Sequence, residues 1–145
     1  ENVNILDLYS GIGSFGIECI SRGARKTTFV ENDSNALTVL EKNIKLLKIE
    51  KKSKIQKTKI ISFLKQTKTD DKYEIIFFDP PFSEDYFLEE LKKIQNSNIY
   101  KTNHLIVIHR DKKSKDDFLG VVNIFMTKKY GRSKILFGNF NLNIV

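Results

Sequence analysis

The sequence predicts an α/β fold: a doubly wound, Rossmann-like sheet that is mostly parallel and ends in an antiparallel hairpin. Short apolar runs of strand length alternate with longer segments of helical period, which is typical of parallel α/β sheets. A glycine-rich segment follows the first strand, and the last two strands are separated only by "YGRS" (130–133), which leaves no room for a crossover helix. No linker interrupts the 145 residues, so we expect one domain over residues 1–145.

The first half of the chain is predicted to form three strands and three helices. They alternate, starting with a strand, over residues 3–9, 14–23, 26–31, 33–49, 53–59 and 61–66. We expect Gly23 to be the C-cap of the first helix, because glycine readily adopts the left-handed conformation that ends helices. Asp33 or Ser34 is expected to cap the second helix, since either side chain can accept a hydrogen bond from a free backbone N–H.

The second half begins with "YEIIFFD" (73–79), an uninterrupted apolar run that is typical of a central parallel strand buried on both faces. The elements predicted after it are a helix near 84–95, a strand at 104–109, a short helical piece near 114–119 and a hairpin at 121–140. Alternating strands and helices followed by a hairpin place a single antiparallel strand at the end of the sheet.

The composition suggests an anionic partner. A net charge of +7 and a pI of about 9.4 favour nucleic acid, but the use of only four arginines among 25 basic residues equally fits the codon drift of an AT-rich genome. One cysteine fits a reducing compartment, and no apolar run reaches the roughly 18 residues of a membrane helix. We therefore expect a cytoplasmic protein that contacts no membrane, and a monomer is the default expectation. Neither histidine has neighbours at metal-ligand spacing, so no metal is expected.

The segment "DLYSGIGSFG" (7–16) has the spacing G-x-G-x-x-G between a strand and a helix. Glycines let the backbone turn tightly and approach a ligand, and Glu31, 20 residues after Gly11, can bind two ribose hydroxyls. Gly11 and Gly13 therefore predict a bound ligand, whereas close helix–strand packing is a sufficient reason for Gly16. Two ligands suit this pattern, a nicotinamide dinucleotide and S-adenosylmethionine.

Asp7 favours S-adenosylmethionine. A dinucleotide would place an anionic pyrophosphate over the loop, where a carboxylate at the strand end repels it. S-adenosylmethionine instead offers an ammonium and a sulfonium, which form strong charge-assisted contacts with a carboxylate. The structural alternative is that Asp7 only caps the turn and that Glu31 is a solvated strand end.

The only two prolines, Pro80 and Pro81, follow Asp79 in "DPPF". The first and fourth strands of a doubly wound sheet flank its ligand site, so this segment should lie beside the cofactor. Proline fixes its own backbone and extends the preceding residue, which makes the Asp79 carboxylate and the Pro80 carbonyl a stiff pair of acceptors. Such a pair can hold both N–H groups of a nucleobase amine while Phe82 stacks on the base. A plain strand-to-helix turn with a buried aromatic is the alternative.

The chain resembles the RsmD-type ribosomal RNA methyltransferases, which make N2-methylguanine in bacterial small-subunit 16S rRNA. The resemblance lies in "LDLYSGIGSFGIECISRGARKTTFVENDSNALTVLEKNI" (6–44), "IIFFDPPF" (75–82) and "KKYGRSKILFG" (128–138). It implies a Rossmann-like methyltransferase sheet, S-adenosyl-L-methionine as the cofactor, and ribosomal RNA in a partly assembled small subunit as the partner. The family has a basic arm before the first strand, so we expect that this chain, which opens at Glu1, lacks its natural N-terminal arm.

The resemblance also implies roles for individual residues. The cofactor-binding residues expected from it are Asp7, Tyr9, Ser10, Gly11, Gly13, Glu31, Asn32, Lys59 and Ile60. The catalytic residues expected from it are Asp79, Pro80, Pro81 and Phe82. This chain has Lys59 where many methyltransferases carry an acid, and His109 where the family often has Glu.

Basic side chains around the hairpin are candidates for RNA phosphate contacts, although a solvated strand end explains them equally well. These candidates are Lys128, Lys129, Arg132 and Lys134. The leading interpretation is guanine-N2 methylation of ribosomal RNA. The alternatives are an adenine-N6 methyltransferase acting on DNA or RNA, an NAD-dependent oxidoreductase, and a non-catalytic RNA-binding module.

Overall fold

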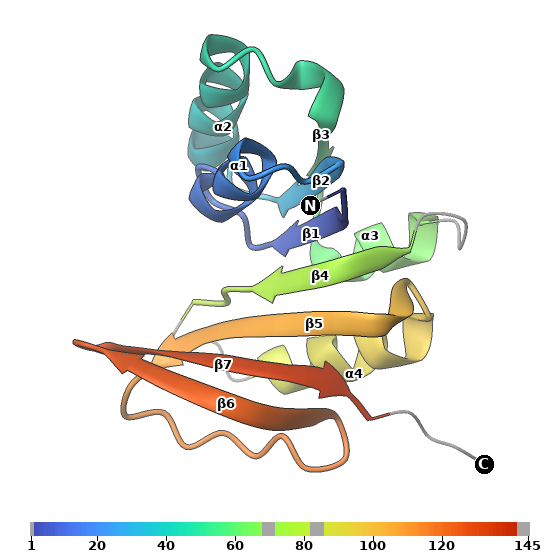
Figure 1. Ribbon diagram of the computed structural model, residues 1–145, viewed down its shortest axis with the longest axis vertical. Helices are drawn as coiled ribbons and strands as arrows, with labels where there is room; N and C mark the ends of the chain where they lie inside the picture. Colours follow the sequence, from blue (N-terminus) through green and yellow to red (C-terminus); the bar gives the residue numbers. More distant parts are fainter. Residues whose placement is uncertain (1, 68–71, 82–85, 142–145) are drawn as a thin grey trace.

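The computed structural model describes residues 2–67, 72–81 and 86–141. Seven strands form one sheet in the order β3-β2-β1-β4-β5-β7-β6 (Figure 1). The strands are β1 (Asn4–Leu8), β2 (Lys26–Glu31), β3 (Ser53–Lys57), β4 (Tyr73–Phe78), β5 (Tyr100–Asp111), β6 (Val122–Tyr130) and β7 (Ser133–Phe140). The helices are α1 (Ser14–Ser21), α2 (Ser34–Leu46), α3 (Ile60–Gln66) and α4 (Phe87–Ser97), with a short 3-10 helix, η1, at Glu50–Lys52.

The predicted fold class is confirmed. Strands β1 to β5 pair in parallel, and β7 runs antiparallel to both β5 and β6. The last strand of the chain inserts between β5 and β6, so β6 forms the edge of the sheet. The sequence predicted the hairpin but not this order, because both of its strands have similar apolar patterns.

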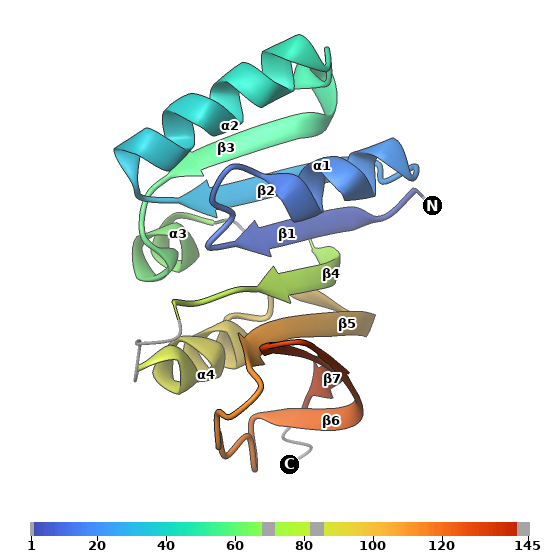
Figure 2. The same cartoon turned by 90° about the vertical axis from the view of Figure 1, so that its left-hand side faces the viewer.

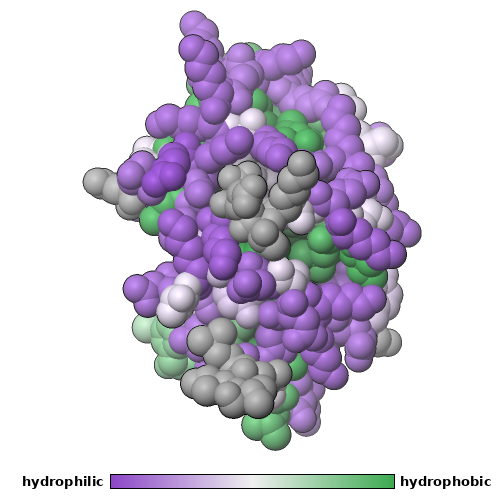
Figure 3. All heavy atoms as spheres, turned by 90° about the vertical axis from the view of Figure 1, so that its right-hand side faces the viewer, coloured by the Kyte–Doolittle hydropathy of each residue, from purple (hydrophilic) through white to green (hydrophobic). Residues whose placement is uncertain are grey.

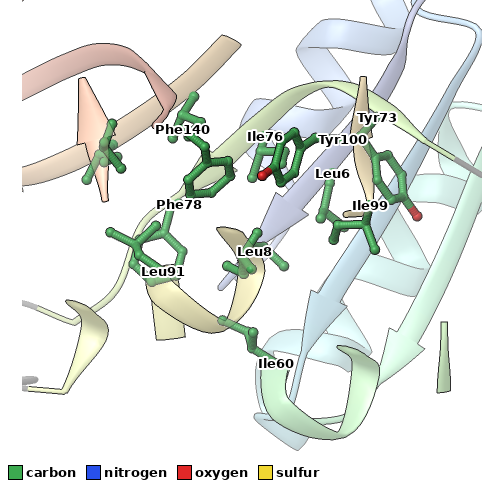
Figure 4. Close-up of a cluster of buried hydrophobic side chains, with 14 of the residues drawn as sticks. Leu6, Leu8, Ile60, Tyr73, Ile76, Phe78, Leu91, Ile99, Tyr100 and Phe140 are labelled. Atoms are coloured by element: carbon green, nitrogen blue, oxygen red, sulfur yellow. The ribbon is translucent and has the colours of Figure 1, made fainter. Parts of the chain in front are cut away.

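Helices cover the sheet on both faces. Leu8 of β1 and Phe78 of β4 point toward Leu91 of α4 in the larger core (Figure 4), and Figure 1 shows α3 and α4 behind the strands. On the other face, Phe29 of β2 packs against Leu40 of α2 in a smaller core beside α1. Side chains therefore alternate between two hydrophobic layers, as expected for buried parallel strands.

The chain changes direction between β1 and β4. From β1 it proceeds through β2 to β3, and from β4 it proceeds the other way to β5. The arrowheads of β1 and β4 lie side by side (Figure 2), so the loops that leave them diverge and leave a crevice between them. The side of the molecule that lies to the right in Figure 1 is covered mostly by hydrophilic side chains (Figure 3).

Most predicted elements are present, with small shifts at their ends. Asp33, not Ser34, is the N-cap of α2, and its carboxylate accepts a hydrogen bond of 2.8 Å from the N–H of Ala36. Helix α1 has Arg22 as its C-cap, and Gly23 follows with a φ of 100°. The predicted cap is thus displaced by one residue, and glycine supplies the left-handed conformation just after it.

The predicted helical piece near 114–119 is wrong, because these residues form turns and irregular backbone. Tertiary contacts hold them instead. The buried guanidinium of Arg110 pairs with Asp116 at 2.9 Å and lies over the ring of Phe87. The ammonium of Lys134 donates a hydrogen bond of 2.6 Å to the carbonyl of Ser114. Contacts with the preceding strand β5 and with β7 thus take the place of the local hydrogen bonds of a helix.

Candidate active site

A cleft of about 800 Å³ lies at the carboxyl ends of β1, β2 and β4. Its lining residues are Tyr9, Val30, Glu31, Asn32, Asp33, Ser34, Thr58, Lys59, Ile60, Ile61, Ser62, Pro81, Tyr86 and Glu90. A hollow of about 380 Å³, here called the side hollow, adjoins it and is lined by Tyr9, Glu31, Asp79, Pro80 and Pro81. Because Tyr9, Glu31 and Pro81 line both spaces, two ligands could meet there.

The glycine loop packs more tightly than the sequence indicated. Gly13 is the N-cap of α1 with a φ of 90°, and a Cβ added there would lie 2.4 Å from Leu40 Cδ1. A Cβ on Gly16 would lie 2.4 Å from the ring of Phe29. The positive φ of Gly13 and its close packing against Leu40 therefore give a structural reason for glycine there, beside the ligand that the sequence predicts. Gly11, with a φ of 56° and no atom within 4 Å of an added Cβ, remains available for close approach to a ligand.

Glu31 joins the glycine loop to the end of β2. One of its carboxylate oxygens accepts a hydrogen bond of 2.8 Å from the N–H of Gly11. The other accepts hydrogen bonds of 2.8 Å and 2.9 Å from the backbone N–H groups of Asn32 and Asp33. A carboxylate offers about four lone-pair sites, so these three bonds orient Glu31 and leave it able to accept a ligand hydroxyl.

Asp7 lies beneath the loop, below the cleft surface, and is 1% exposed. Its Oδ2 accepts a hydrogen bond of 3.1 Å from the N–H of Gly16. This contact agrees with the alternative in which Asp7 caps the turn. Its Oδ1 is buried and finds no hydrogen-bond partner among the described residues, and the same holds for Ser10 Oγ. Buried polar atoms normally have partners, so these two atoms mark a place where a ligand's donors would fit.

Burial raises the pKa of Asp7 from 3.8 to about 7, because a buried carboxylate loses its hydration. The hydrogen bond from Gly16 lowers this pKa in part, and the charges of Asp79 and Glu31 raise it further. Three carboxylates therefore share one neighbourhood, and a cationic group bound among them would relieve their repulsion.

Asp79 follows β4 directly, and its backbone N–H reaches the carbonyl of Leu8 at 3.4 Å. Its side chain is 39% exposed, and its Oδ1 lies 2.8 Å from Nδ1 of His109 on β5. Pro80 is buried and Pro81 exposed. Phe82, the fourth predicted catalytic residue, lies outside the described residues.

Strand alternation brings the acidic residues to one face of the sheet. Leu8, Phe78 and Ile108 belong to the core beneath α4. His109, next to Ile108 within β5, therefore points to the opposite face. Asp79 follows the end of β4, and its Oδ1 meets Nδ1 of His109 on that face. The same reasoning applies to Asp7 and Glu31, since Leu6 and Val30 belong to that core. Sequence analysis found the three acids but gave His109 no contact with them.

Tyr9 holds the start of the loop in place. It has a φ of 55°, and its hydroxyl donates a hydrogen bond to the carboxylate of Glu90 on α4. Its ring also meets Phe78 edge-on, with centroids 5.6 Å apart. Glu90 is 6% exposed and lines the cleft. Sequence reasoning missed Glu90, because a lone acid on a polar helix carries no signal.

Of the predicted cofactor residues, five line the cleft and four form or underlie the loop. The five are Tyr9, Glu31, Asn32, Lys59 and Ile60, and the four are Asp7, Ser10, Gly11 and Gly13. The described residues contain no helix long and apolar enough to cross a membrane. In the same described part of the chain, no group of three or more His, Cys, Asp or Glu side chains could hold a metal ion.

The basic hairpin residues differ in their surroundings. His109 pairs with Ile135 across the sheet, and Ile135 with Lys128, so Lys128 shares a row and a face with His109. Lys129 pairs with Lys134 on the other face, and Lys134 is bound to the carbonyl of Ser114. Arg132 lies in the turn between β6 and β7, and its carbonyl accepts a hydrogen bond of 2.7 Å from the N–H of Lys112.

Comparison with known proteins identifies relatives over most of the chain. A family model described as Conserved hypothetical protein 95 matches residues 1–139. Proteins named Ribosomal RNA small subunit methyltransferase D from Buchnera aphidicola subsp. Acyrthosiphon pisum and Haemophilus influenzae are 35% and 32% identical over 113 and 108 residues. These matches cover 78% and 74% of this chain but only 58% and 56% of the two relatives. A protein of the same name from Buchnera aphidicola subsp. Baizongia pistaciae is 30% identical, covering 96% of this chain and 69% of the relative.

Solved structures agree with the fold. A putative methylase from Haemophilus influenzae matches with a TM-score of 0.82 and 27% identity, covering 97% of this chain and 88% of that one. A conserved hypothetical protein from Streptococcus pyogenes has the same fold, with a TM-score of 0.86, 23% identity and coverage of 96% and 86%. The chain belongs to the Conserved hypothetical protein 95 family, the RsmD-type family whose relatives carry the name ribosomal RNA small subunit methyltransferase D.

Proposed function

We propose that this chain transfers a methyl group from S-adenosylmethionine to the exocyclic N2 amine of a guanine in small-subunit ribosomal RNA. The observation that carries the proposal is the position of Asp79 and Pro80 in the side hollow, next to the larger cleft. The name of the relatives supports ribosomal RNA as the substrate class. Guanine N2 as the target, and a partly assembled cytoplasmic subunit as the setting, follow from the family resemblance.

The cleft suits the cofactor in size and chemistry, since small-molecule sites measure roughly 300–1,000 Å³. Glu31 accepts hydrogen bonds from the ribose hydroxyls, and Lys59 and Ile60 border the adenine. The methionine end would lie over the glycine loop, where the unpartnered oxygens of Asp7 and Ser10 would hold its ammonium. Binding of this cation favours the ionised form of Asp7, so it lowers the pKa of Asp7.

The target amine is a weak nucleophile, because its lone pair is delocalised into the base. The Asp79 carboxylate and the Pro80 carbonyl accept its two N–H groups and turn the remaining lobe toward the methyl donor. When bound, the cofactor would supply a methyl group on a sulfonium sulfur, and its leaving group would be a neutral thioether that keeps the electron pair of the carbon–sulfur bond. The methylated nitrogen is then cationic, and one of its protons passes to Asp79 and on to water.

The RNA approaches from the side of the hairpin. The base must leave its stack to reach Asp79, and Phe82 is expected to stack on it. Lys128 is the hairpin cation best placed to bind a neighbouring phosphate, since it lies in the row of His109 and Ile135 on the face of Asp79. Lys134 is assigned a structural role, because its ammonium is bound to the carbonyl of Ser114.

The charge of the site opposes a dinucleotide. Asp79 and Glu31 lie close enough to Asp7 to raise its pKa, and together these carboxylates would repel a pyrophosphate. An adenine-N6 amine would fit the same acceptor pair, so the distinction between adenine and guanine rests on the family resemblance.

The decisive experiment is transfer of a tritiated methyl group from S-adenosylmethionine to unmodified small ribosomal subunits, followed by nucleoside analysis. We expect label in N2-methylguanosine, and none with the Asp79→Ala variant. Label in N6-methyladenosine would favour the adenine alternative. Cofactor binding without any labelled product would favour the RNA-binding module. Calorimetric binding of NAD in place of S-adenosylmethionine would favour the oxidoreductase.

A further inference from the structure

We propose that His109 is a positioning residue that holds the carboxylate of Asp79 in the orientation needed to accept the target amine. The inference rests on the proposed function, and it adds a residue to the acceptor pair. His109 lies at the carboxyl end of β5, on the same face of the sheet as Asp79. Its Nδ1 lies 2.8 Å from Oδ1 of Asp79.

The direction of this hydrogen bond follows from the chemistry of the pair. An ionised carboxylate only accepts hydrogen bonds, so Nδ1 of His109 must carry the proton and donate it. One oxygen of Asp79 is thereby occupied. No residue in the described ranges 2–67, 72–81 and 86–141 hydrogen-bonds to the other oxygen, Oδ2. The hydrogen bond from His109 thus fixes the rotation of the carboxylate, and Oδ2 keeps both of its lone pairs for the amine.

A fixed orientation matters because Asp79 is partly exposed. Its side chain is 39% accessible and follows the last residue of β4, whereas the side chain of His109 is 25% accessible and extends from within β5. Strand pairing of Phe78 with Ile108 sets the two residues side by side. Without the imidazole, the carboxylate could rotate freely into solvent, and the acceptor pair with Pro80 would be present for only part of the time.

The first test is nuclear magnetic resonance of the imidazole N–H protons, which needs no cofactor or RNA. The chain has two histidines. His104 is an internal control, because its Nε2 accepts a hydrogen bond of 2.9 Å from the N–H of Phe140 and its Nδ1 therefore donates to the carbonyl of Lys101 at 2.7 Å. We expect two hydrogen-bonded Nδ1–H signals, of which Asp79→Ala removes only that of His109. Two signals unchanged by Asp79→Ala would overturn the inference.

The second test compares two variants of similar size. In His109→Asn, the amide nitrogen is attached at the same atom as Nδ1 and can still donate to Asp79, whereas His109→Leu has no donor. We expect His109→Leu to lower kcat by about 10- to 100-fold with KM values for both substrates unchanged, since small misplacements at a reacting centre cost this much. His109→Asn should recover most of the wild-type kcat. A leucine variant with wild-type kcat, or an asparagine variant as slow as leucine, would refute the positioning role.

The two tests separate the failure of this inference from that of the proposed function. If the wild-type protein labels no RNA, methyl transfer is refuted, while the resonance experiment still decides whether His109 holds Asp79. If the wild-type protein is active and both His109 variants match it, methyl transfer stands and the positioning role is refuted. Thermal unfolding of both variants shows whether a loss of kcat reflects a loss of folded protein.

Discussion

Replacing Asp7 with asparagine should make the folded protein more stable at neutral and alkaline pH. Asp7 is buried, and its pKa of about 7 in the folded state lies above the ordinary value of 3.8. Below 3.8 both the folded and unfolded states hold the proton. As the pH rises from 3.8 to 7 the unfolded chain ionises first, so the free energy of unfolding of the wild-type protein falls, and it levels off above pH 7.

The size of this effect follows from the pKa values. One pKa unit corresponds to about 1.4 kcal/mol, so the ionised form of Asp7 costs about 4 kcal/mol of stability above pH 7. Asparagine cannot ionise, and its oxygen can still accept the hydrogen bond from Gly16. Its buried amide group costs about 1–3 kcal/mol if it lacks a partner. We therefore expect Asp7→Asn to gain about 1–3 kcal/mol above pH 7 and to lose a similar amount near pH 4.

Urea unfolding followed by circular dichroism between pH 4 and pH 8 measures this difference. The exposed Asp117 supplies the control, because Asp117→Asn should leave the pH dependence of the wild-type protein unchanged. If Asp7→Asn loses stability between pH 4 and pH 8 as steeply as the wild-type protein, Asp7 is already ionised in the folded state and our account of its burial is wrong. Calorimetry should show the opposite trend for function, namely weaker binding of S-adenosylmethionine by Asp7→Asn, because the cationic ligand loses its carboxylate.

Three further substitutions test other parts of the site. Asp79→Ala should lower methyl transfer by at least about 100-fold in the tritium assay, with nearly unchanged cofactor affinity, since it removes an acceptor that acts only on the amine. Gly16→Ala should lower the free energy of unfolding by about 1–3 kcal/mol in urea, because the added Cβ would lie 2.4 Å from the ring of Phe29. Lys128→Ala should weaken RNA binding and reduce its salt dependence by about one phosphate contact, whereas Lys129→Ala, on the other face, should change it less.

Each of these expectations has a result that contradicts it. Wild-type turnover by Asp79→Ala would remove the acceptor pair from the mechanism. Unchanged stability of Gly16→Ala would mean that α1 can move away from β2 at little cost. If RNA binding by the Lys128 and Lys129 variants depended equally on salt, the RNA would not follow the face of the sheet that carries His109 and Lys128.

Local pattern was sufficient for much of the fold and for part of the site. The apolar run at 73–79 predicted β4, observed at Tyr73–Phe78, because burial on both faces demands continuous hydrophobicity. The spacing of the glycines and "DPPF" placed both segments at strand ends, and the structure brings those ends together. The helix predicted near 114–119 failed because Arg110 and Lys134 draw this segment into tertiary contacts that its own residues do not reveal.

The contacts that complete the site join residues far apart in the sequence. His109 meets Asp79 across 30 residues, and Tyr9 meets Glu90 across 81. Neither pair shares a motif, so no spacing in the sequence could indicate that they touch. Gly13 is a further example, because the side chain that crowds an added Cβ there is Leu40 of α2, far along the chain.

The sequence by itself determined the succession of strands and helices along the chain, the hairpin, and the two acidic segments that begin at Asp7 and Asp79. These features depend on periodicity and on the backbone preferences of neighbouring residues. Only the tertiary structure decided that Asp7 is buried with a raised pKa, that His109 lies 2.8 Å from Asp79, and that Lys128 shares the row of His109 while Lys134 binds Ser114. Desolvation and hydrogen bonding are set by atoms from distant segments, and these atoms meet only once the sheet has formed.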